Sequence, residues 1–265
     1  MNATKGSSPL TTAWLFGFTV FLSVALISFP AVSALGADKA ADRQEATQLV
    51  EKARLTLDGF MTDNTLGAFR DLLKQAKGVL ISPSLLKGAF VVGVSGGNAV
   101  FLARDKATEQ WSEPAFYTIG EASFGLQIGG EASEVILLAM TDRGVNALLS
   151  NSLKLGGDVG VAAGPVGLGA AAATANLSAD ILSFSRSKGL YGGISLDGAV
   201  VAVRSGLNEA YYGKSASPMD ILVRHSVKNA QSRALIEDLA KSSAAKTAGG
   251  EEKIKGAMFR ATRRG

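Results

Sequence analysis

One serine of the chain stands in a pattern that hydrolases use. Gly93-Val94-Ser95-Gly96-Gly97 satisfies Gly-x-Ser-x-Gly, in which the serine sits on a sharp turn between a strand and a helix. Here residues 98–102 have the character of a second strand, so the glycines around Ser95 are those expected of a hairpin turn. The pattern therefore favours a turn, and a Ser95 hydrolase is the weakest of the functions considered below.

The residues that most often support catalysis or bind metals are scarce. The chain has no cysteine and a single histidine, His225, which lies among polar and basic neighbours in a C-terminal helical segment. Nucleophile–base pairs and zinc sites draw mainly on these two residue types. The glycine-rich run 156–169 lacks the spacing of a phosphate-binding loop. We therefore expect no enzyme, no metal site and no cofactor, and we expect His225 at the surface or at an interface.

The N-terminal segment has the composition of an export signal. Lys5 precedes the uncharged apolar stretch 13–29, and small residues follow up to Ala34 and again at Ala37. We expect residues 1–34 to form a signal peptide that is cut near Ala34 or Ala37; an uncleaved membrane anchor is the alternative. The product would be periplasmic or extracellular, peripheral to a membrane, and stabilised by its core without disulfides.

Most of the net charge of +4 lies at the C-terminal end. Residues 242–265 are rich in Ala, Lys and Gly and have no sustained apolar period, so we expect a basic disordered tail. The remaining segment, 38–241, is close to neutral and is expected to form one folded domain. Because this domain has no basic stripe with interleaved aromatic residues, nucleic acid is not an expected partner.

The periodicity changes once along the domain. Residues 38–61 form an amphipathic pattern with a period of about four, and a second helix is expected to bury Leu66, Phe69 and Leu72. Beyond Gly78 the pattern is that of strands, and the 31 glycines favour bulges and tight turns. Ser217 followed by proline predicts the start of the C-terminal helices.

Three hairpins are expected from turn chemistry. The pairs are 89–94 with 99–103, 124–128 with 134–140, and 190–195 with 199–203, the last across Asp197-Gly198. The expected fold class is α+β: a glycine-rich, mainly antiparallel sheet that could curl toward a barrel, flanked by N-terminal and C-terminal helices.

Three segments, taken together, resemble the SYLF domain family. They are Lys77-Gly78-Val79 with the following glycine hairpin, Trp111-Ser112-Glu113-Pro114 continuing to residue 131, and residues 183–198. The similarity covers residues 46–212. It implies a non-enzymatic domain that binds phospholipid, notably phosphoinositides in eukaryotic members, with an N-terminal amphipathic helix in contact with the membrane. Some fungal members also bind actin, but an exported bacterial chain would meet none.

The resemblance implies a set of lipid-binding residues in this chain. The expected head-group contacts are basic, and the expected inserting residues lie on the apolar face of the first helix: Lys39, Arg43, Lys52, Arg54, Arg186 and Lys188, with Arg204 as a weaker candidate, and Leu49, Leu57 and Phe60. The polar face of this helix carries both signs of charge. The alternatives are that the apolar face packs on the sheet and that the basic residues are solvated or paired with carboxylates.

Two further functions stay open beside the hydrolase. The first is association with anionic phospholipid membrane by a protein of the cell envelope, which the resemblance favours. The second is an interaction module that binds another envelope protein through the edge of its sheet.

Overall fold

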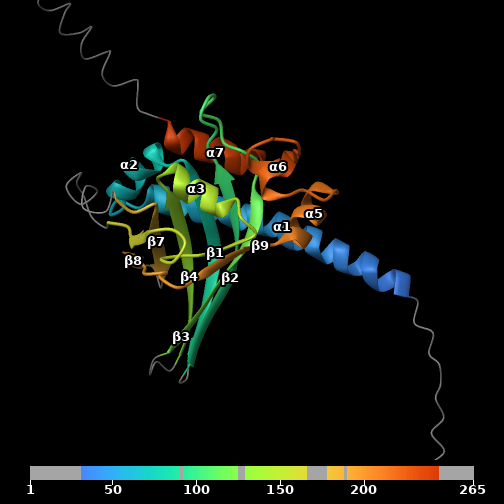
Figure 1. Cartoon of the computed structure of the whole chain (residues 1–265), viewed down its shortest axis with the longest axis horizontal. Coiled ribbons are helices and arrows are strands. Elements are labelled where there is room, and N and C mark those ends of the chain that lie inside the picture. Colours follow the sequence, from blue (N-terminus) through green and yellow to red (C-terminus); the bar gives the residue numbers. More distant parts are fainter. Residues whose placement is uncertain (1–30, 90–91, 125–128, 166–177, 188–189, 245–265) are drawn as a thin grey trace, which may run out of the picture.

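The computed structural model describes residues 31–89, 92–124, 129–165, 178–187 and 190–244. They form a curled, mostly antiparallel sheet with helices at both ends of the chain, as the sequence predicts (Figure 1). The strands are β1 (Gly78–Ala89), β2 (Val92–Ala103), β3 (Ala115–Phe124), β4 (Gly129–Ala139), β5 (Ser152–Lys154), β6 (Val161–Ala163), β7 (Ile181–Ser187), β8 (Leu190–Gly193) and β9 (Val200–Val203). The helices are α1 (Ala31–Thr62), α2 (Gly67–Gln75), α3 (Asp142–Leu148), α5 (Ser205–Tyr212), α6 (Pro218–Leu222), the 3-10 helix η1 (Ala230–Ser232) and α7 (Arg233–Ser243).

The sheet is built around its longest strands. Its strand order is β5-β9-β3-β2-β1-β4-β7-β6, and β8 also pairs with β7. Only the β6–β7 pairing is parallel among the described ladders. Because the sheet curls, one face encloses a core that contains Phe101, Tyr117 and Ile221. The other face is covered by helices.

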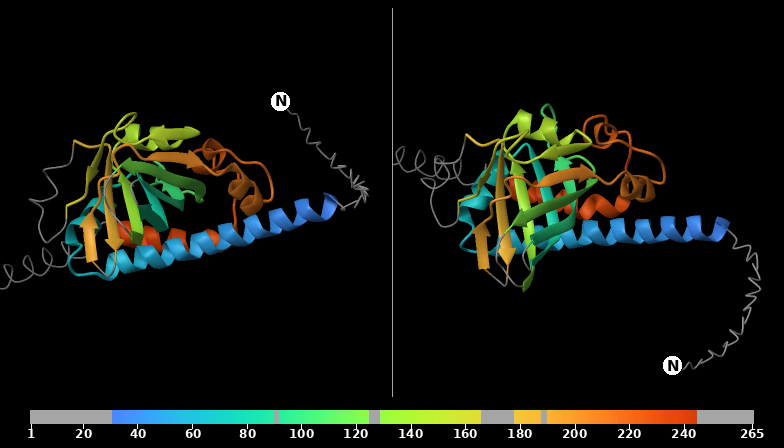
Figure 2. Two further views of the ribbon diagram at one scale, coloured as in Figure 1. Left: turned by 90° about the horizontal axis from the view of Figure 1, so that it is seen from below. Right: turned by 60° about the horizontal axis from the view of Figure 1, so that its bottom comes forward.

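Helix α1 supplies most of that cover. It runs along the sheet beside α7, and its N-terminal end extends beyond the body (Figure 2). Phe60 at its C-terminal end is fully buried and lies 5.4 Å, between ring centroids, from Phe69 of α2, which lies 5.1 Å from Phe184 of β7. The regularly spaced apolar residues of α1 therefore pack in the core. Helix α1 begins at Ala31, earlier than the predicted residue 38 and inside the region of the expected signal cleavage.

Other local predictions are confirmed. The buried residues of α2 include Phe69 and Leu72, as its stripe predicts. Ser217 caps α6 in a reciprocal capping box with Asp220. Within the described residues, no helix combines the length and the apolar character needed to cross a bilayer.

The predicted turn at residues 95–98 is wrong. These residues lie inside β2, and β1 continues to Ala89. Gly97 is required for another reason: a β-carbon there would collide with the backbone oxygen of Ser84, in the irregular part of β1 between Ile81 and Leu86. Close approach of two backbones, and not a turn, explains this glycine.

The other two predicted hairpins are also wrong. Strand β4 pairs with β1 and β7, and the strand before it is β3 at 115–124, while residues 125–128 lie outside the described part of the chain. The Asp197-Gly198 turn exists, with φ of 90° at Gly198. It does not join paired strands, because β8 pairs with β7 whereas β9 pairs with β3 and β5. Turn chemistry is local, but strand pairing is decided by the whole sheet.

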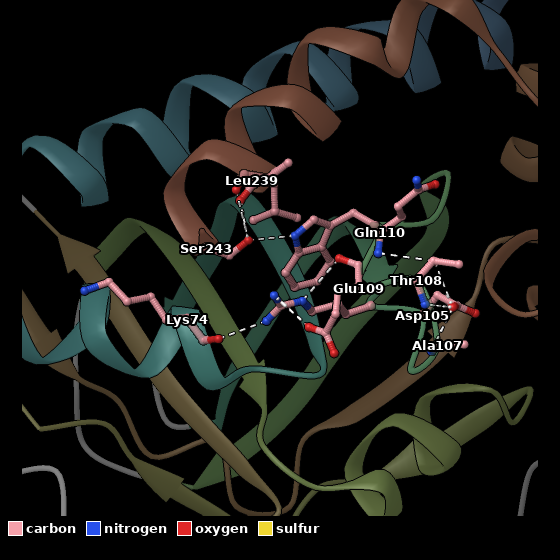
Figure 3. Close-up of polar contacts among 11 residues, drawn as sticks. Lys74, Asp105, Ala107, Thr108, Glu109, Gln110, Leu239 and Ser243 are labelled. Atoms are coloured by element: carbon pink, nitrogen blue, oxygen red, sulfur yellow. Dashed lines mark hydrogen bonds and ion pairs between the residues drawn. The ribbon is translucent and has the colours of Figure 1, made fainter. Parts of the chain in front are cut away.

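Trp111 fastens the last helix to the sheet. Its indole N–H donates to Ser243 Oγ of α7 at 2.9 Å, and the Ser243 hydroxyl donates to the Leu239 carbonyl at 2.8 Å (Figure 3). Arg104 packs near the indole ring, 6.0 Å from its centroid, and donates to the Lys74 carbonyl at 2.9 Å. The loop that carries Trp111 thus ties α2, the sheet and α7 together.

The next residues of the same segment fasten the chain between α5 and α7. Ser232 donates its hydroxyl hydrogen to Glu113 Oε2 at 2.5 Å, and Tyr212 donates to the Pro114 carbonyl at 2.6 Å. The Trp-Ser-Glu-Pro segment therefore holds the C-terminal helices in place, which is a structural role.

We predict that Phe60→Ala destabilises the protein by about 3–5 kcal/mol, since it empties a fully buried aromatic site. The matched control is Leu55→Ala on the same helix, where the side chain is 54% exposed, and the expected change is within about 0.5 kcal/mol. Urea denaturation followed by circular dichroism measures both. Equal effects of the two substitutions would show that α1 does not pack as described.

A second prediction concerns pH. Burial raises the pKa of Glu113 above its ordinary value, and the Ser232 hydroxyl bond offsets this only in part. In the window above the ordinary value of 4.5 the folded state holds more protons than the unfolded state, so this group lowers stability as pH rises. Glu113→Gln should therefore gain stability relative to the native chain between acidic and neutral pH. Urea midpoints of both proteins, measured at acidic and at neutral pH, test this. A difference between the two proteins that does not change with pH would contradict it.

Candidate functional site

Two of the expected head-group residues, Lys39 and Arg43, lie where α1 passes α5. Lys39 Nζ is 3.2 Å from Glu209 Oε1, and Arg43 Nε donates to the Ala210 carbonyl at 3.2 Å. Both line a hollow of about 380 Å³ that also contains the carboxylate of Asp42. The hollow is electrically mixed, so it does not present a concentrated positive charge.

Arg54 holds α1 to α7. Its guanidinium lies 2.7 Å from Glu51 Oε1 and 3.3 Å from Asp238 Oδ2. The hydrogen bonds that Arg54 donates to Glu51 and to Asp238 raise the pKa of Arg54, and the bond to Glu51 in turn lowers the pKa of Glu51. The charge of Arg54 is thus already matched within the protein.

Arg186 is placed under the C-terminal half of α1. It stands opposite Glu134 in the β4–β7 ladder and forms an ion pair with it, and Thr56 of α1 donates to Glu134 Oε1 at 3.3 Å. A β-carbon on Gly59 would lie 2.7 Å from Arg186 Nη1, so the glycine lets the guanidinium pass beneath the helix. Arg186 is therefore well placed to fix the position of α1. The neighbouring candidate, Lys188, lies outside the described residues.

The weaker candidate, Arg204, belongs to a polar cluster at the other side of α1. Its Nη1 donates to Asn98 Oδ1 at 3.0 Å, and its Nη2 lies 3.9 Å from Glu45 Oε1. Asn98 Nδ2 donates to the same carboxylate at 2.5 Å. This cluster joins α1 to β2.

Lys52 differs from the other basic candidates. In the part of the chain that the structure describes, no carboxylate pairs with it and no hydrogen bond engages its ammonium group. It lies at the rim of a groove of about 290 Å³ between α1 and the sheet, with Leu49, Leu86, Gly96 and Gly97 also in the lining. Glu45 also lines the groove, but Asn98 and Arg204 engage its carboxylate. Leu86 is 60% exposed, so a cation with no carboxylate partner among the described residues and an apolar side chain share one groove. We take this groove as the candidate functional site.

The expected inserting residues are in the core. Leu57 and Phe60 are essentially inaccessible, and Leu49 is 8% exposed. Exposing each side chain of this type costs about 1.5–3 kcal/mol. A base near an anionic surface contributes only about 1 kcal/mol. Contact of these three residues with lipid would require α1 to leave the sheet at a cost of several kcal/mol, whereas its polar face is accessible while it stays docked.

The residues considered for catalysis do not meet in one site. Ser95 is buried in β2 and donates to Glu121 Oε2 at 3.3 Å. His225, with φ of 50°, lies 3.8 Å from Asp105 Oδ2 in a different cleft of about 600 Å³ whose lining does not include Ser95. Among the described residues, no group of three or more His, Asp or Glu side chains is placed to hold a metal ion.

Sequence reasoning missed the sheet side of the groove. Leu86 lies outside the predicted strands and Gly96-Gly97 lie in the predicted turn, although Leu86 and Gly96 are paired residues of adjacent strands. The available signal was the spacing of Lys52 and Leu55 on the solvent side of α1, away from the apolar stripe. Only the register of β1 and β2 brings Leu86 into the same groove as Lys52.

Comparison with known proteins gives one family match and a set of relatives. Residues 120–242 match the family described as "Ysc84: Las17-binding protein actin regulator". The chain is 32% identical over 170 residues to "SH3 domain-containing YSC84-like protein 1" of Homo sapiens. The aligned region covers 63% of this chain and 49% of the relative. It is 33% identical over 156 residues to "LAS seventeen-binding protein 3" of Saccharomyces cerevisiae. That aligned region covers 57% of this chain and 34% of the relative. The chain thus spans half or less of the length of these relatives.

We predict that Arg186 and Glu134 are energetically coupled. A double-mutant cycle with Arg186→Gln and Glu134→Gln should give a coupling free energy of about 1 kcal/mol or more, because both side chains are largely buried beneath α1. The control cycle uses the exposed pair Lys74 and Asp71 of α2, where about 0.5 kcal/mol or less is expected. Urea denaturation of the four proteins in each cycle provides the values. Coupling no larger than that of the control would refute a role in holding α1.

Proposed function

We propose, from the premise that this chain contains a domain of the Ysc84 (SYLF) family, that it associates reversibly with anionic phospholipid membranes. The family is one of binding and regulator proteins, and its relatives carry names that refer to binding partners. A binding role without catalysis is consistent with the separation of Ser95 from His225. The exported location expected from the N-terminal segment makes the cell envelope the proposed place of action.

The observation that carries the proposal is the groove beside α1. Lys52 offers a positive charge that the described protein does not neutralise, and Leu86 offers an exposed apolar side chain beside it. A lipid head group with its first acyl segments presents the complementary pair of features. Four other basic candidates would have to exchange a carboxylate for a phosphate, which gains little: Lys39, Arg54, Arg186 and Arg204. Arg43 already donates to the Ala210 carbonyl.

The electrostatic part of this association is weak. At about 1 kcal/mol for each base near an anionic surface, Lys52 contributes about 1 kcal/mol. Screening reduces this contribution at high salt. The proposed association is therefore reversible and depends on ionic strength.

A second candidate function is binding of a protein through the sheet edge. Strand β8 pairs only with β7 among the described strands, and its Leu190 is 77% exposed. An open strand edge can accept an added strand from a partner. The description of the matched family as Las17-binding favours a protein partner for this class of domain.

We predict that the protein co-sediments with phosphatidylglycerol vesicles at low ionic strength and not with phosphatidylcholine vesicles. The protein should start at Leu35, because the apolar run 13–29 would itself partition into lipid. Lys52→Gln should weaken binding about fivefold, which corresponds to the loss of one surface charge. The control Lys106→Gln removes an exposed lysine that is paired with Asp142, outside the groove, and should leave binding unchanged. No co-sedimentation of the native chain at low salt would refute the proposed function.

A further inference from the structure

The four longest strands extend past the rest of the sheet and end together (Figure 1). We call this end the sheet tip and define it as residues 86–89, 92–96, 120–124 and 129–132. Its first row of paired residues runs Gly120–Gly96–Leu86–Ala132 across β3, β2, β1 and β4. On this side of the sheet the row is uncharged, and Leu86 is its only large side chain.

The opposite side of the tip has a different character. Side chains alternate along strands, so the neighbouring row Glu121–Ser95–Lys87–Glu131 faces the other way. Ser95 donates to Glu121, and Ser187 donates to Glu131. The tip is therefore amphipathic across its thickness, with one flat uncharged face and one polar face.

The glycines of the flat face are not required by packing. A β-carbon on Gly120 would meet no atom within 4 Å, and one on Gly96 would meet only the Ile119 carbonyl oxygen at 3.7 Å. Neither residue has a positive φ. Glycine weakens a strand, and one common reason for it there is the close approach of a ligand or another backbone. The flat face has the properties of a contact surface.

Beyond the row of Glu121, Lys87 and Glu131 the strand ends carry no charge. No charged residue occurs between Lys87 and Arg104, or between Glu121 and Glu131. Lys52 on α1 is an exposed base on the same side as the flat face. A flat uncharged face with a lysine beside it matches the order of layers in a membrane, in which acyl chains lie beneath phosphates.

We propose that the sheet tip enters the membrane interface, with its flat face toward the acyl chains and with Lys52 at the level of the phosphates. This inference rests on the proposed lipid binding and names the part of the molecule that performs it. Glu121 and Glu131 lie on the opposite face and stay in contact with water. Helix α1 remains docked on the sheet throughout.

The chain has no cysteine, so single-cysteine labelling tests the inference directly. An environment-sensitive NBD probe is attached at Leu86→Cys on the tip, at Leu55→Cys on α1, or at Val223→Cys directly after α6, all exposed positions. With phosphatidylglycerol vesicles, the probe at 86 should shift to the blue, brighten and be quenched by doxyl-labelled lipid. The probe at 223, at the other end of the molecule, should not change (Figure 1).

Co-sedimentation of the same samples separates the two levels of the account. If the protein co-sediments but the fluorescence of the probe at 86 does not change, the tip assignment is wrong and lipid binding still holds. This conclusion does not depend on the response of the probe at 55. Unlabelled native chain that does not co-sediment overturns both.

A pair of glycine variants gives a second test without a probe. Gly120→Ala adds a methyl group in open space and should leave vesicle affinity unchanged, whereas Gly120→Asp places a charge on the flat face and should lower affinity about fivefold or more. Circular dichroism and urea denaturation confirm that both variants fold. Equal affinity of the two folded variants would contradict the inference.

Discussion

The packing of α1 against the curled sheet is the interaction on which the rest of the structure depends. The apolar stripe of this helix closes one of the two cores, and Phe60 connects it through Phe69 to the sheet residue Phe184. Polar contacts fix the helix at intervals along its length: Lys39 to Glu209, Glu45 to Asn98, Arg54 to Asp238, and Thr56 to the Glu134–Arg186 pair. Burial supplies most of the free energy, and the polar contacts specify where the helix lies.

This arrangement determines which surfaces remain for function. Because carboxylates of the body already match most basic residues near α1, the charge available to an anionic partner is small and local. Lys52 stands apart from that pattern, and the sheet tip beside it is uncharged on one face. Because the apolar face of α1 is buried in the core, the proposed membrane contact lies at the end of strands β1–β4 and not on this helix face.

The sequence predicted the helices better than the sheet. A period near four and a proline after Ser217 are local signals, and they identified α1, α2 and the start of α6. Glycines were misleading because a turn, a close backbone approach and an open face all use the same residue: Gly198 is a turn glycine, Gly97 clears Ser84, and Gly120 faces open space. The partners of the basic residues could not be predicted, since Glu209, Asp238 and Glu134 are distant in sequence from the residues that they neutralise.

The most direct test of the central claim is whether α1 stays on the sheet when the protein binds a membrane. Spin labels at Leu55→Cys on α1 and at Val223→Cys, directly after α6, report the distance between the two elements by pulsed electron spin resonance. The account predicts the same single distance distribution in solution and on phosphatidylglycerol vesicles. A longer or broadened distribution on vesicles would show that α1 leaves the sheet and would contradict it.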